Sequence, residues 1–334
     1  MSVPIEPIKR TLRAHLSHVS GKAVKLFRLK TRRARTKIHG RRVLRGVPAG
    51  ARIAEAINAE QPLLVSRFGT TESTLIKFFL ENEKGGQCAF PRALQELITK
   101  NSGFYPSSDE NLSRFCQESL DAMGEIDLLG VRAHPIEYQY WKLEDLMIRS
   151  ATPNAVFVDL EELSPVGRTD SWTKHLSGRK VLVIHPFANT IKSQFKNKEK
   201  IFPNSNFLPV MKLDVIRAVQ SAGTNQTLAG FPDWFSARDA MIDEIRTRDF
   251  DIALIGAGAY GLFLGAECRR LGKQAIHIGG ATQLLFGILG RRWTEEVGTS
   301  SQDIKKHVNQ YWVSAAKDEI PEGERTVEGG GYWV

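Results

Sequence analysis

The sequence predicts an α/β protein with a mainly parallel sheet and helices on both faces. From residue 48 onward, short apolar segments alternate with amphipathic helical patterns, which is typical of parallel strands joined by crossover helices. One of these segments, residues 252–255, runs directly into a glycine-rich turn at residues 256–261, and a helical pattern follows from residue 262 to 271. A strand, a glycine turn and a helix in this order are typical of the Rossmann-like class.

The apolar segments define the predicted strands. They are short and rich in Val, Ile and Leu, as buried strands are. We predict strands at residues 63–68, 126–131, 155–160, 181–185, 252–255 and 275–278. Among the helical patterns between them, one covers residues 237–248. Its expected N-cap is Ser236, with Asp239 three residues later as in a capping box.

Residues 1–47 differ from the rest of the chain in charge. They hold 14 of the 46 Lys and Arg residues and one acidic residue, Glu6, so their net charge is +13 and that of residues 48–334 is −4. An apolar helical stripe runs through them at spacings of three and four, formed by Ile5, Ile8, Leu12, Leu16, Val19 and Ala23. We therefore divide the chain into a basic amphipathic N-terminal arm, residues 1–47, and a single Rossmann-like domain, residues 48–334.

The sequence allows two binding partners for this arm. A basic amphipathic helix followed by a polybasic stretch can bind an anionic membrane surface. The same apolar stripe could instead dock on the protein's own domain. Nucleic acid is not an expected partner, because Phe27 is the only aromatic residue of the arm and no RNA-binding module is recognisable.

Composition and the absence of known motifs exclude several cellular compartments and several kinds of site. The chain has no run of 18 apolar residues, no N-terminal secretory signal and no C-x-x-C pair among its three cysteines, so we expect a cytoplasmic protein without structural zinc or disulfides. The absence of H-E-x-x-H, G-x-S-x-G and Walker A motifs argues against a zinc peptidase, an α/β hydrolase and a P-loop enzyme. The terminal aromatic residues Tyr332 and Trp333 are expected to pack back on the domain.

The turn at residues 256–261 has the spacing G-x-G-x-x-G, formed by Gly256, Gly258 and Gly261. Such glycines let backbone N–H groups and a helix N-terminus approach a phosphate closely. A dinucleotide site would also need an acidic residue at the end of the next strand, which here ends in Gly279 and Gly280. The pattern therefore predicts a nucleotide-phosphate site and argues against a nicotinamide cofactor. Tight strand-to-helix packing without a ligand is the alternative.

Polar residues and glycines follow the carboxyl ends of four predicted strands, where ligands bind in an open parallel sheet. They are Arg67, Gly69, Glu72, His185, Gly256, Gly258, Tyr260, Gly261, Gly279, Gly280 and Gln283. The charged and aromatic ones also have a structural interpretation. Glu72 falls in the first turn of a helix, where a carboxylate is favourable in any protein. His185 and Tyr260 could simply fill the core.

The segment Arg67-Phe68-Gly69-Thr70-Thr71-Glu72 resembles the R-F-G-D-G-E segment of bacterial GT-D-type glycosyltransferases, which build surface glycans on protein or lipid acceptors. Later segments fit the same pattern in the same order, at residues 181–187, 256–261, 279–283, 292–293 and 331–333. The resemblance covers residues 50–334 and omits the basic arm.

The resemblance implies transfer of a hexose from a nucleotide sugar, with UDP as the expected nucleotide, to a glycan or lipid-linked acceptor in cell-surface polysaccharide or glycoprotein assembly. Together with the positions of these residues at the sheet edge, it leads us to expect catalysis by Glu72, Arg67 and His185. We expect nucleotide-sugar binding by Gly69, Gly256, Gly258, Tyr260, Gly261, Gly279, Gly280 and Gln283. The arm would hold the enzyme at the inner face of the cell membrane. The alternative class is a non-catalytic nucleotide- or sugar-binding accessory protein of envelope glycan assembly.

The same resemblance bears on a metal. Family members use a D-x-E pair to hold a divalent ion on the donor diphosphate. Here Thr70 stands where the aspartate would be, and Glu72 matches the remaining carboxylate. The resemblance therefore implies Mn²⁺ or Mg²⁺ on Glu72 alone, completed by substrate phosphates and water, with weaker metal dependence than in a D-x-E enzyme.

Overall fold

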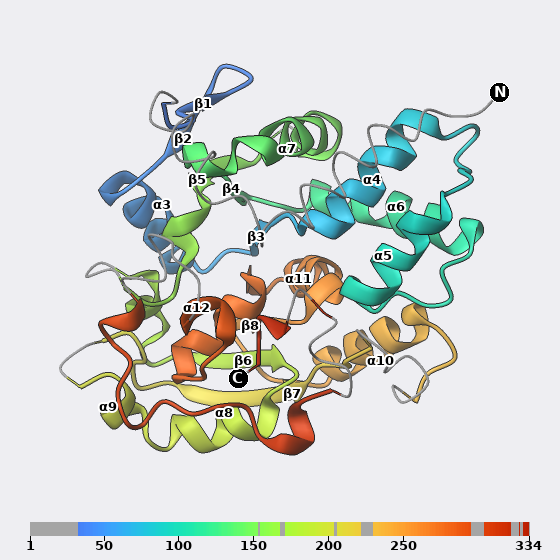
Figure 1. Cartoon of the computed structure of the whole chain (residues 1–334). Helices are drawn as coiled ribbons and strands as arrows, with labels where there is room; N and C mark the ends of the chain where they lie inside the picture. Colours follow the sequence, from blue (N-terminus) through green and yellow to red (C-terminus); the bar gives the residue numbers. More distant parts are fainter. Residues whose placement is uncertain are drawn as a thin grey trace.

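The computed structural model describes residues 33–152, 154–167, 171–203, 206–221, 230–294, 304–321, 327 and 330–333. These residues form one nine-stranded sheet with helices on both faces (Figure 1). The strand order is β1-β2-β5-β4-β3-β9-β8-β6-β7, and every pairing except β1–β2 is parallel. The predicted α/β class is confirmed. The predicted amphipathic helix of the arm lies outside the described residues.

All six predicted strands are present, with ends that shift by at most two residues. The strands are β1 (Lys37–Ile38), β2 (Arg41–Leu44), β3 (Leu63–Arg67), β4 (Leu128–Val131), β5 (Val156–Asp159), β6 (Lys180–His185), β7 (Lys212–Arg217), β8 (Ile252–Ile255) and β9 (Gln274–His277). The sequence pattern does not predict β7, which pairs with β6 at the edge of the sheet. An edge strand is partly exposed, so its Lys212 and Asp214 break the apolar pattern of a central strand.

The described helices cover the sheet in two layers. They are α3 (Val47–Asn58), α4 (Thr70–Asn82), α5 (Arg92–Ser102), α6 (Asp109–Gly124), α7 (Tyr138–Ala151), α8 (Ala188–Phe195), α9 (Lys198–Ile201), α10 (Trp234–Arg246), α11 (Gly261–Arg270) and α12 (Arg291–Thr294). Short 3₁₀ helices lie between them: η2 (Pro135–Glu137), η3 (Leu160–Leu163), η4 (Trp172–Leu176), η6 (Gly258–Tyr260), η7 (Gly279–Phe286) and η8 (Lys317–Glu319).

The helix predicted at residues 237–248 is α10, but the predicted cap is wrong. Its N-cap is Asp233, whose carboxylate accepts a hydrogen bond of 2.6 Å from the backbone N–H of Ser236. Because an aspartate caps a helix as well as a serine does, the helix begins earlier, at Trp234.

The sheet is buried on both faces, as its continuous apolar strands require. Alternate residues of one strand point to opposite faces, so Leu182 and Ile184 of β6 pack in one core cluster. Val181 and Val183 of the same strand pack in the other. The first cluster includes residues of α4, α6, α10 and α11, and the second includes residues of α3, α8 and η7. The central strands are therefore held rigidly, and their carboxyl ends are fixed relative to one another.

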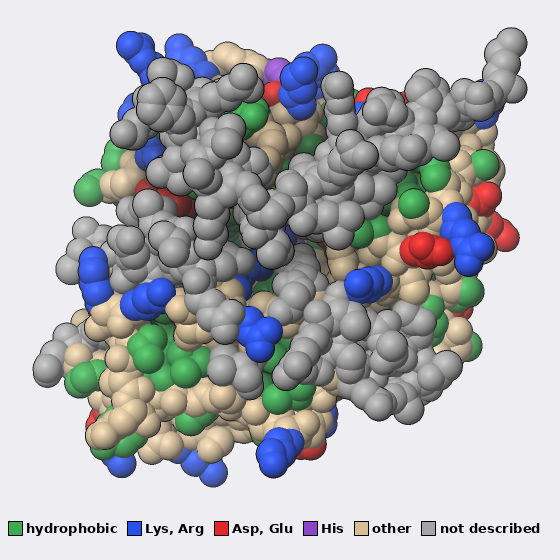
Figure 2. All heavy atoms as spheres, viewed as in Figure 1, with side chains coloured by type: hydrophobic (Ala, Val, Ile, Leu, Met, Phe, Trp, Pro, Cys, Tyr) green, Lys and Arg blue, Asp and Glu red, His purple; other side chains and the backbone are tan. Residues whose placement is uncertain are grey.

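Residues 37–44, assigned above to the arm, belong to the sheet. β1 and β2 form an antiparallel hairpin, and β2 pairs with β5 through Val43 and Leu44. Lys37 of β1 and Arg42 of β2 are exposed, and Figure 2 shows Lys and Arg side chains around this hairpin at the top of the view. Because basic residues cover the exposed side of the hairpin, its two strands are not recognisable from the sequence. The folded domain begins before residue 48.

The expected packing of the C-terminal aromatic residues is confirmed. The backbone N–H groups of Arg291 and Arg292 donate to the carbonyl oxygens of Trp333 (3.2 Å) and Gly331 (2.9 Å). Trp333 is buried, and Tyr332 lies so close to Gly280 that a Cβ atom there would collide with its ring. The end of the chain is therefore part of the wall at the carboxyl end of β9.

Candidate functional site

A cavity of about 520 Å³ lies at the carboxyl ends of the central strands. Its wall contains residues that follow β3, β4, β5, β6, β8 and β9, together with part of the C-terminal segment. β3 and β9 are neighbours in the sheet although they are far apart in sequence. Because ligands bind at this edge of an open parallel sheet, the cavity is the candidate functional site.

The glycines around the cavity serve two different purposes. Three make room for side chains that approach the backbone closely: Gly256 for the His185 ring, Gly261 for the His277 ring and Gly279 for Arg67 Nη2. Gly258 differs, because its φ is +54° and a Cβ atom there would meet no atom within 4 Å. Gly258 lines the cavity, so it is a place where a ligand can lie directly against the backbone.

The helices α4, α8 and α11 begin near the cavity, and a carboxylate lies at the N-terminus of the first two. Glu72 occupies the first turn of α4. Glu319 accepts hydrogen bonds from the backbone N–H groups of Asn189 (2.6 Å) and Thr190 (3.1 Å) at the start of α8. By contrast, α11 and the preceding η6 have no side-chain cap and no acidic residue in the first turn. The positive end of the α11 dipole therefore remains available for an anion.

The two histidines in the cavity wall are buried and neutral. His185 Nδ1 accepts a hydrogen bond of 3.1 Å from the backbone N–H of Phe187, which places the ring proton on Nε2. His277 Nδ1 lies 2.9 Å from Ser66 Oγ. Burial lowers the pKa of His185 to about 3, and burial together with the charge of Arg67 lowers the pKa of His277 to about 3. His185 is thus suited to donate a hydrogen bond rather than to act as a base.

Tyr260 and Gln283 line the cavity, but their polar groups bind the protein itself. The Tyr260 ring stacks on Trp234 with centroids 4.6 Å apart, and its hydroxyl lies 2.9 Å from Ser221 Oγ. Burial raises the pKa of this phenol. The Gln283 amide donates to three backbone carbonyl oxygens, those of Ile288, Leu289 and Tyr332. Both side chains shape the wall, and their contacts to a nucleotide stay predictions.

The Glu72 carboxylate turns back over the N-terminus of its own helix. One oxygen accepts a hydrogen bond of 2.6 Å from Ser102 Oγ, and the other lies so close to Gly69 that a Cβ atom there would collide with it. Glu72, Gly69 and Ser102 all line the cavity. The carboxylate is therefore held in one orientation at the cavity wall, partly neutralised by the helix dipole.

Arg67, the last residue of β3, carries a positive charge into the cavity. Its Nη1 donates to the carbonyl oxygen of Phe68 at 3.2 Å, and its guanidinium lies against Gly279. Within the described part of the chain, Arg67 makes no ion pair with a carboxylate. A cation that faces a cavity without an acidic partner is suited to bind an anionic ligand.

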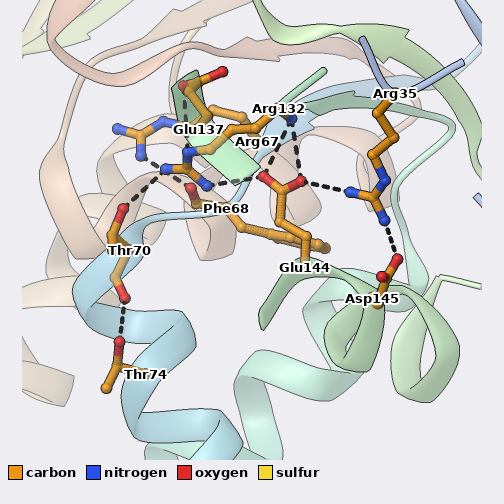
Figure 3. Close-up of polar contacts among 9 residues, drawn as sticks. All are labelled: Arg35, Arg67, Phe68, Thr70, Thr74, Arg132, Glu137, Glu144 and Asp145. Atoms are coloured by element: carbon orange, nitrogen blue, oxygen red, sulfur yellow. Dashed lines mark hydrogen bonds and ion pairs between the residues drawn. The ribbon is translucent and has the colours of Figure 1, made fainter. Parts of the chain in front are cut away.

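A second arginine follows β4, and Figure 3 shows its contacts. Arg132 Nη2 donates to Thr70 Oγ1 at 2.9 Å, and Arg132 Nη1 donates to Glu144 Oε1 at 2.8 Å. Glu144 also accepts from Arg35 Nη1 at 3.2 Å, and Arg35 pairs in addition with Asp145. Burial raises the pKa of Glu144, and Arg132 opposes that shift. This ion network fixes the Arg132 guanidinium beside the first residue of α4.

Glu137 in η2 also lines the cavity, with its Oε1 3.7 Å from Arg132 Nε. Burial raises the pKa of Glu137 to about 7; Arg132 opposes this shift, and the acidic residues Glu144, Glu161 and Asp159 add to it. A carboxyl group with a pKa near neutrality can exchange a proton at physiological pH. The cavity wall thus contains two carboxyl groups, Glu72 and Glu137, and Glu137 is the one whose pKa burial brings near neutrality.

The residues at position 70 and around it do not fit the metal site that the resemblance implies. Thr70 offers a hydroxyl that already accepts a hydrogen bond from a guanidinium, and a cation beside this position repels a second one. The Glu72 carboxylate is bound by Ser102 and faces Gly69. Among the described residues, no group of three or more His, Cys, Asp or Glu side chains could hold a metal ion.

The structure brings most of the predicted site residues to one cavity. Those in its wall are Arg67, Gly69, Glu72, His185, Gly256, Gly258, Tyr260, Gly279, Gly280 and Gln283, whereas Gly261 lies behind it. Their catalytic and binding roles stay predictions. Sequence reasoning missed Arg132 and Glu137. They follow the predicted strand at residues 126–131, so the rule that selected the other residues would also have found them.

No protein-family model and no curated protein matches this chain. Among matching solved structures, a selenomethionine-substituted domain of unknown function 1792 has 14% identity and a TM-score of 0.42, with 78% of this chain and 83% of that chain covered. A second structure, described as a domain of unknown function 1792 with a distinct glycosyltransferase fold, has 13% identity and a TM-score of 0.41, covering 88% and 98%.

A third, described as a new glycosyltransferase from Streptococcus sanguinis, has 11% identity and a TM-score of 0.39, covering 82% of this chain and 99% of that chain. The chain resembles GT-D-type glycosyltransferases. Because all these TM-scores lie below 0.5, we base the functional proposal on the cavity residues.

No helix in the described ranges is long and apolar enough to cross a bilayer.

Proposed function

We propose that this protein is a glycosyltransferase that takes a hexose from a UDP-sugar and transfers it to a glycan or lipid-linked acceptor. Three features that meet in one cavity carry the proposal. Among the described residues, the start of η6–α11 has no side-chain cap, Gly258 is open, and Arg67 makes no ion pair with a carboxylate. Together they offer N–H donors, space at the backbone and positive charge, which are what a diphosphate requires.

In this proposal the β8 and β9 side binds the donor. The diphosphate lies against Gly258, whose backbone φ angle is +54°, and Arg67, whose guanidinium fills the space beside Gly279, reaches it from the end of β3. His185 donates from Nε2 into the same region, because its Nδ1 is already engaged with Phe187. The donor is therefore held by backbone and by fixed neutral and cationic groups.

Arg67 and Glu72, at and just after the end of β3, carry out the transfer step. Glu72 accepts the proton of the acceptor hydroxyl while that oxygen bonds to the anomeric carbon of the donor sugar. The bond between the anomeric carbon and the diphosphate oxygen breaks, and UDP leaves with the bonding electrons. Arg67 stabilises the negative charge that develops on the departing phosphate. No metal is needed to balance these changes.

A panel of nucleotide sugars tests the proposal. UDP-hexoses should raise the Tm of the full-length protein in a thermal-shift assay, because a ligand that binds only the folded state stabilises it. Transfer should then be detectable with a labelled donor and a lipid or glycan extract as acceptor. Binding of UDP-sugars without transfer to any acceptor would favour the non-catalytic accessory protein instead. Absence of any response to UDP-sugars would contradict the proposed transfer from a UDP-sugar.

We also propose that residues 1–32 hold the protein on anionic membranes. This segment carries eight Lys and Arg residues and one acidic residue, a net charge of +7, so its removal leaves residues 33–334 with a net charge of +2. Each basic residue near an anionic surface contributes about 1 kcal/mol and is screened by salt. Full-length protein should sediment with anionic vesicles at low salt and detach at high salt, whereas residues 33–334 should stay in solution. Equal binding by both proteins, or binding to neutral vesicles, would contradict the role of this segment.

A further inference from the structure

The position that carries an aspartate in the resembling family is bound here by an arginine. Thr70 Oγ1 accepts the hydrogen bond from Arg132 Nη2 at 2.9 Å, and Thr74 Oγ1 donates to the Thr70 carbonyl oxygen at 2.8 Å (Figure 3). An aspartate at position 70 would form an ion pair with Arg132. A threonine accepts one hydrogen bond and leaves the charge of the guanidinium uncompensated from this side.

Arg132 cannot easily leave this place. Arg132 is 8% exposed. Glu144, whose carboxylate accepts a hydrogen bond from Arg132 Nη1, is 1% exposed. The backbone N–H of Arg132 also donates to Glu144 Oε2 at 3.1 Å, so one carboxylate holds both the side chain and the main chain. Arg35 supports the same carboxylate from the other side. This arrangement fixes the guanidinium before any ligand arrives, which lowers the entropic cost of binding.

Arg132 keeps donors for a ligand. A guanidinium has five N–H groups in a planar fork that matches phosphate oxygens. Thr70 and Glu144 each accept one N–H from a terminal nitrogen. Among the described residues, the one partner of Nε is Glu137, at 3.7 Å. Both Arg132 and Arg67 line the cavity, and Figure 3 shows them at the start of α4.

We propose that the donor diphosphate is bound without a divalent metal, by the guanidinium groups of Arg67 and Arg132, with Thr70 keeping Arg132 directed toward the cavity. The inference rests on the proposed function and names the groups that supply the positive charge in it. Arg132 then takes the place that the metal holds in a D-x-E enzyme. Glu72 is free of any ligand role toward a metal and remains the base.

The direct test is calorimetry of UDP binding to the full-length protein, once in EDTA and once in Mn²⁺. The affinity for UDP should be the same in both conditions, within about twofold. An increase of about tenfold or more in Mn²⁺ would overturn the inference. Absence of UDP binding in both conditions would instead overturn the proposed function, so the two failures are distinguishable.

A pair of variants locates the effect. Thr70→Asp should weaken UDP binding in EDTA by about tenfold, because the new carboxylate pairs with Arg132 and repels the diphosphate. An aspartate is favourable at the first position of a helix, so the fold should be kept. Thr74→Asp adds the same charge one turn further along α4, outside the cavity wall, and should leave the affinity within about twofold. Unchanged affinity in Thr70→Asp, or a Mn²⁺ response gained by it, would contradict the role of Arg132.

Discussion

The two sides of the cavity use different parts of the chain. On the β6–β8–β9 side the wall is largely backbone, with Gly256, Gly258 and Gly279 and with histidines that burial keeps neutral. On the β3–β4–β5 side the wall is made of charged side chains, including Arg132 and Glu137. The backbone side can follow the shape of a phosphate but cannot move a proton. The charged side can both transfer a proton and stabilise charge. A loss of sugar transfer with unchanged UDP affinity should therefore come from a substitution on the charged side.

The largest expected effect is on the charged side. Glu72→Gln should reduce sugar transfer by on the order of a hundredfold or more, because the amide cannot accept the acceptor proton. UDP affinity should remain nearly unchanged, and Tm should fall slightly because a charge at a helix N-terminus is lost. Transfer rates and UDP affinity together check this expectation.

Glu81→Gln is the matched control for this variant. Glu81 lies on the same helix, pairs on the surface with Lys77 and is not part of the cavity wall. It should leave the transfer rate unchanged. Near-normal transfer by Glu72→Gln would reduce Glu72 to a residue that stabilises the start of α4.

The next effect belongs to the backbone side. Gly258→Val should lower UDP affinity by about tenfold or more, because a side chain there fills the space that the diphosphate needs. Gly272 provides the control, since its φ is +77°, a Cβ atom on it would also meet no atom within 4 Å, and it lies outside the cavity wall. Gly272→Val carries the same kind of backbone strain, so it should lower Tm but not UDP affinity. Equal losses of affinity in both variants would show that strain, rather than occupied space, is responsible.

The two sides should also respond to pH with opposite sign. His185 and His277 have folded-state pKa values of about 3, below the usual 6.5, so the unfolded chain binds more protons between these values. Stability should therefore fall as pH drops below 6.5, by up to roughly 1.4 kcal/mol per pH unit for each histidine. Denaturant unfolding of the Glu137→Gln variant at pH 7 and pH 5 measures this loss without the opposite contribution of Glu137. A protein that is equally stable at both values would show that the histidines are not buried as neutral rings.

Glu137 should give the smallest effect. Its folded-state pKa of about 7 lies above the usual 4.5, so the folded protein binds more protons between these values and its contribution to stability is lost as pH rises through about 7. Glu137→Gln removes that loss and should raise Tm at pH 8 by about 2 °C relative to the original protein, with no gain at pH 5. A gain that is equal at both pH values would exclude titration of this carboxyl group as the cause.

The same contrast explains what the sequence could predict. The backbone side follows from local patterns, because a buried strand that runs into glycines is visible over a dozen residues, as in residues 252–261. The central strands are equally visible, because burial on both faces demands continuous apolar runs. Strands β1 and β2 are not, because their exposed basic residues dominate the pattern and their pairing with β5 is long-range.

The charged side depends on contacts that no local pattern contains. Arg132 meets Thr70 across 62 positions of the chain, and Arg35 meets Glu144 across 109. Neither pairing has a sequence signature, since isolated charged residues are usually solvated. The expectation of a metal at Glu72 came from the resemblance, and two contacts between residues far apart in the sequence argue against it: Arg132 with Thr70 and Ser102 with Glu72.

The central claim is that the cavity binds a uridine diphosphate group. Calorimetry of the full-length protein with UDP and, separately, with NAD tests it most directly. We predict saturable binding of UDP and no binding of NAD, because the cavity offers glycine N–H groups and Arg67 to a diphosphate and β9 ends without the carboxylate that a nicotinamide cofactor requires. Binding of NAD without binding of UDP would contradict the account.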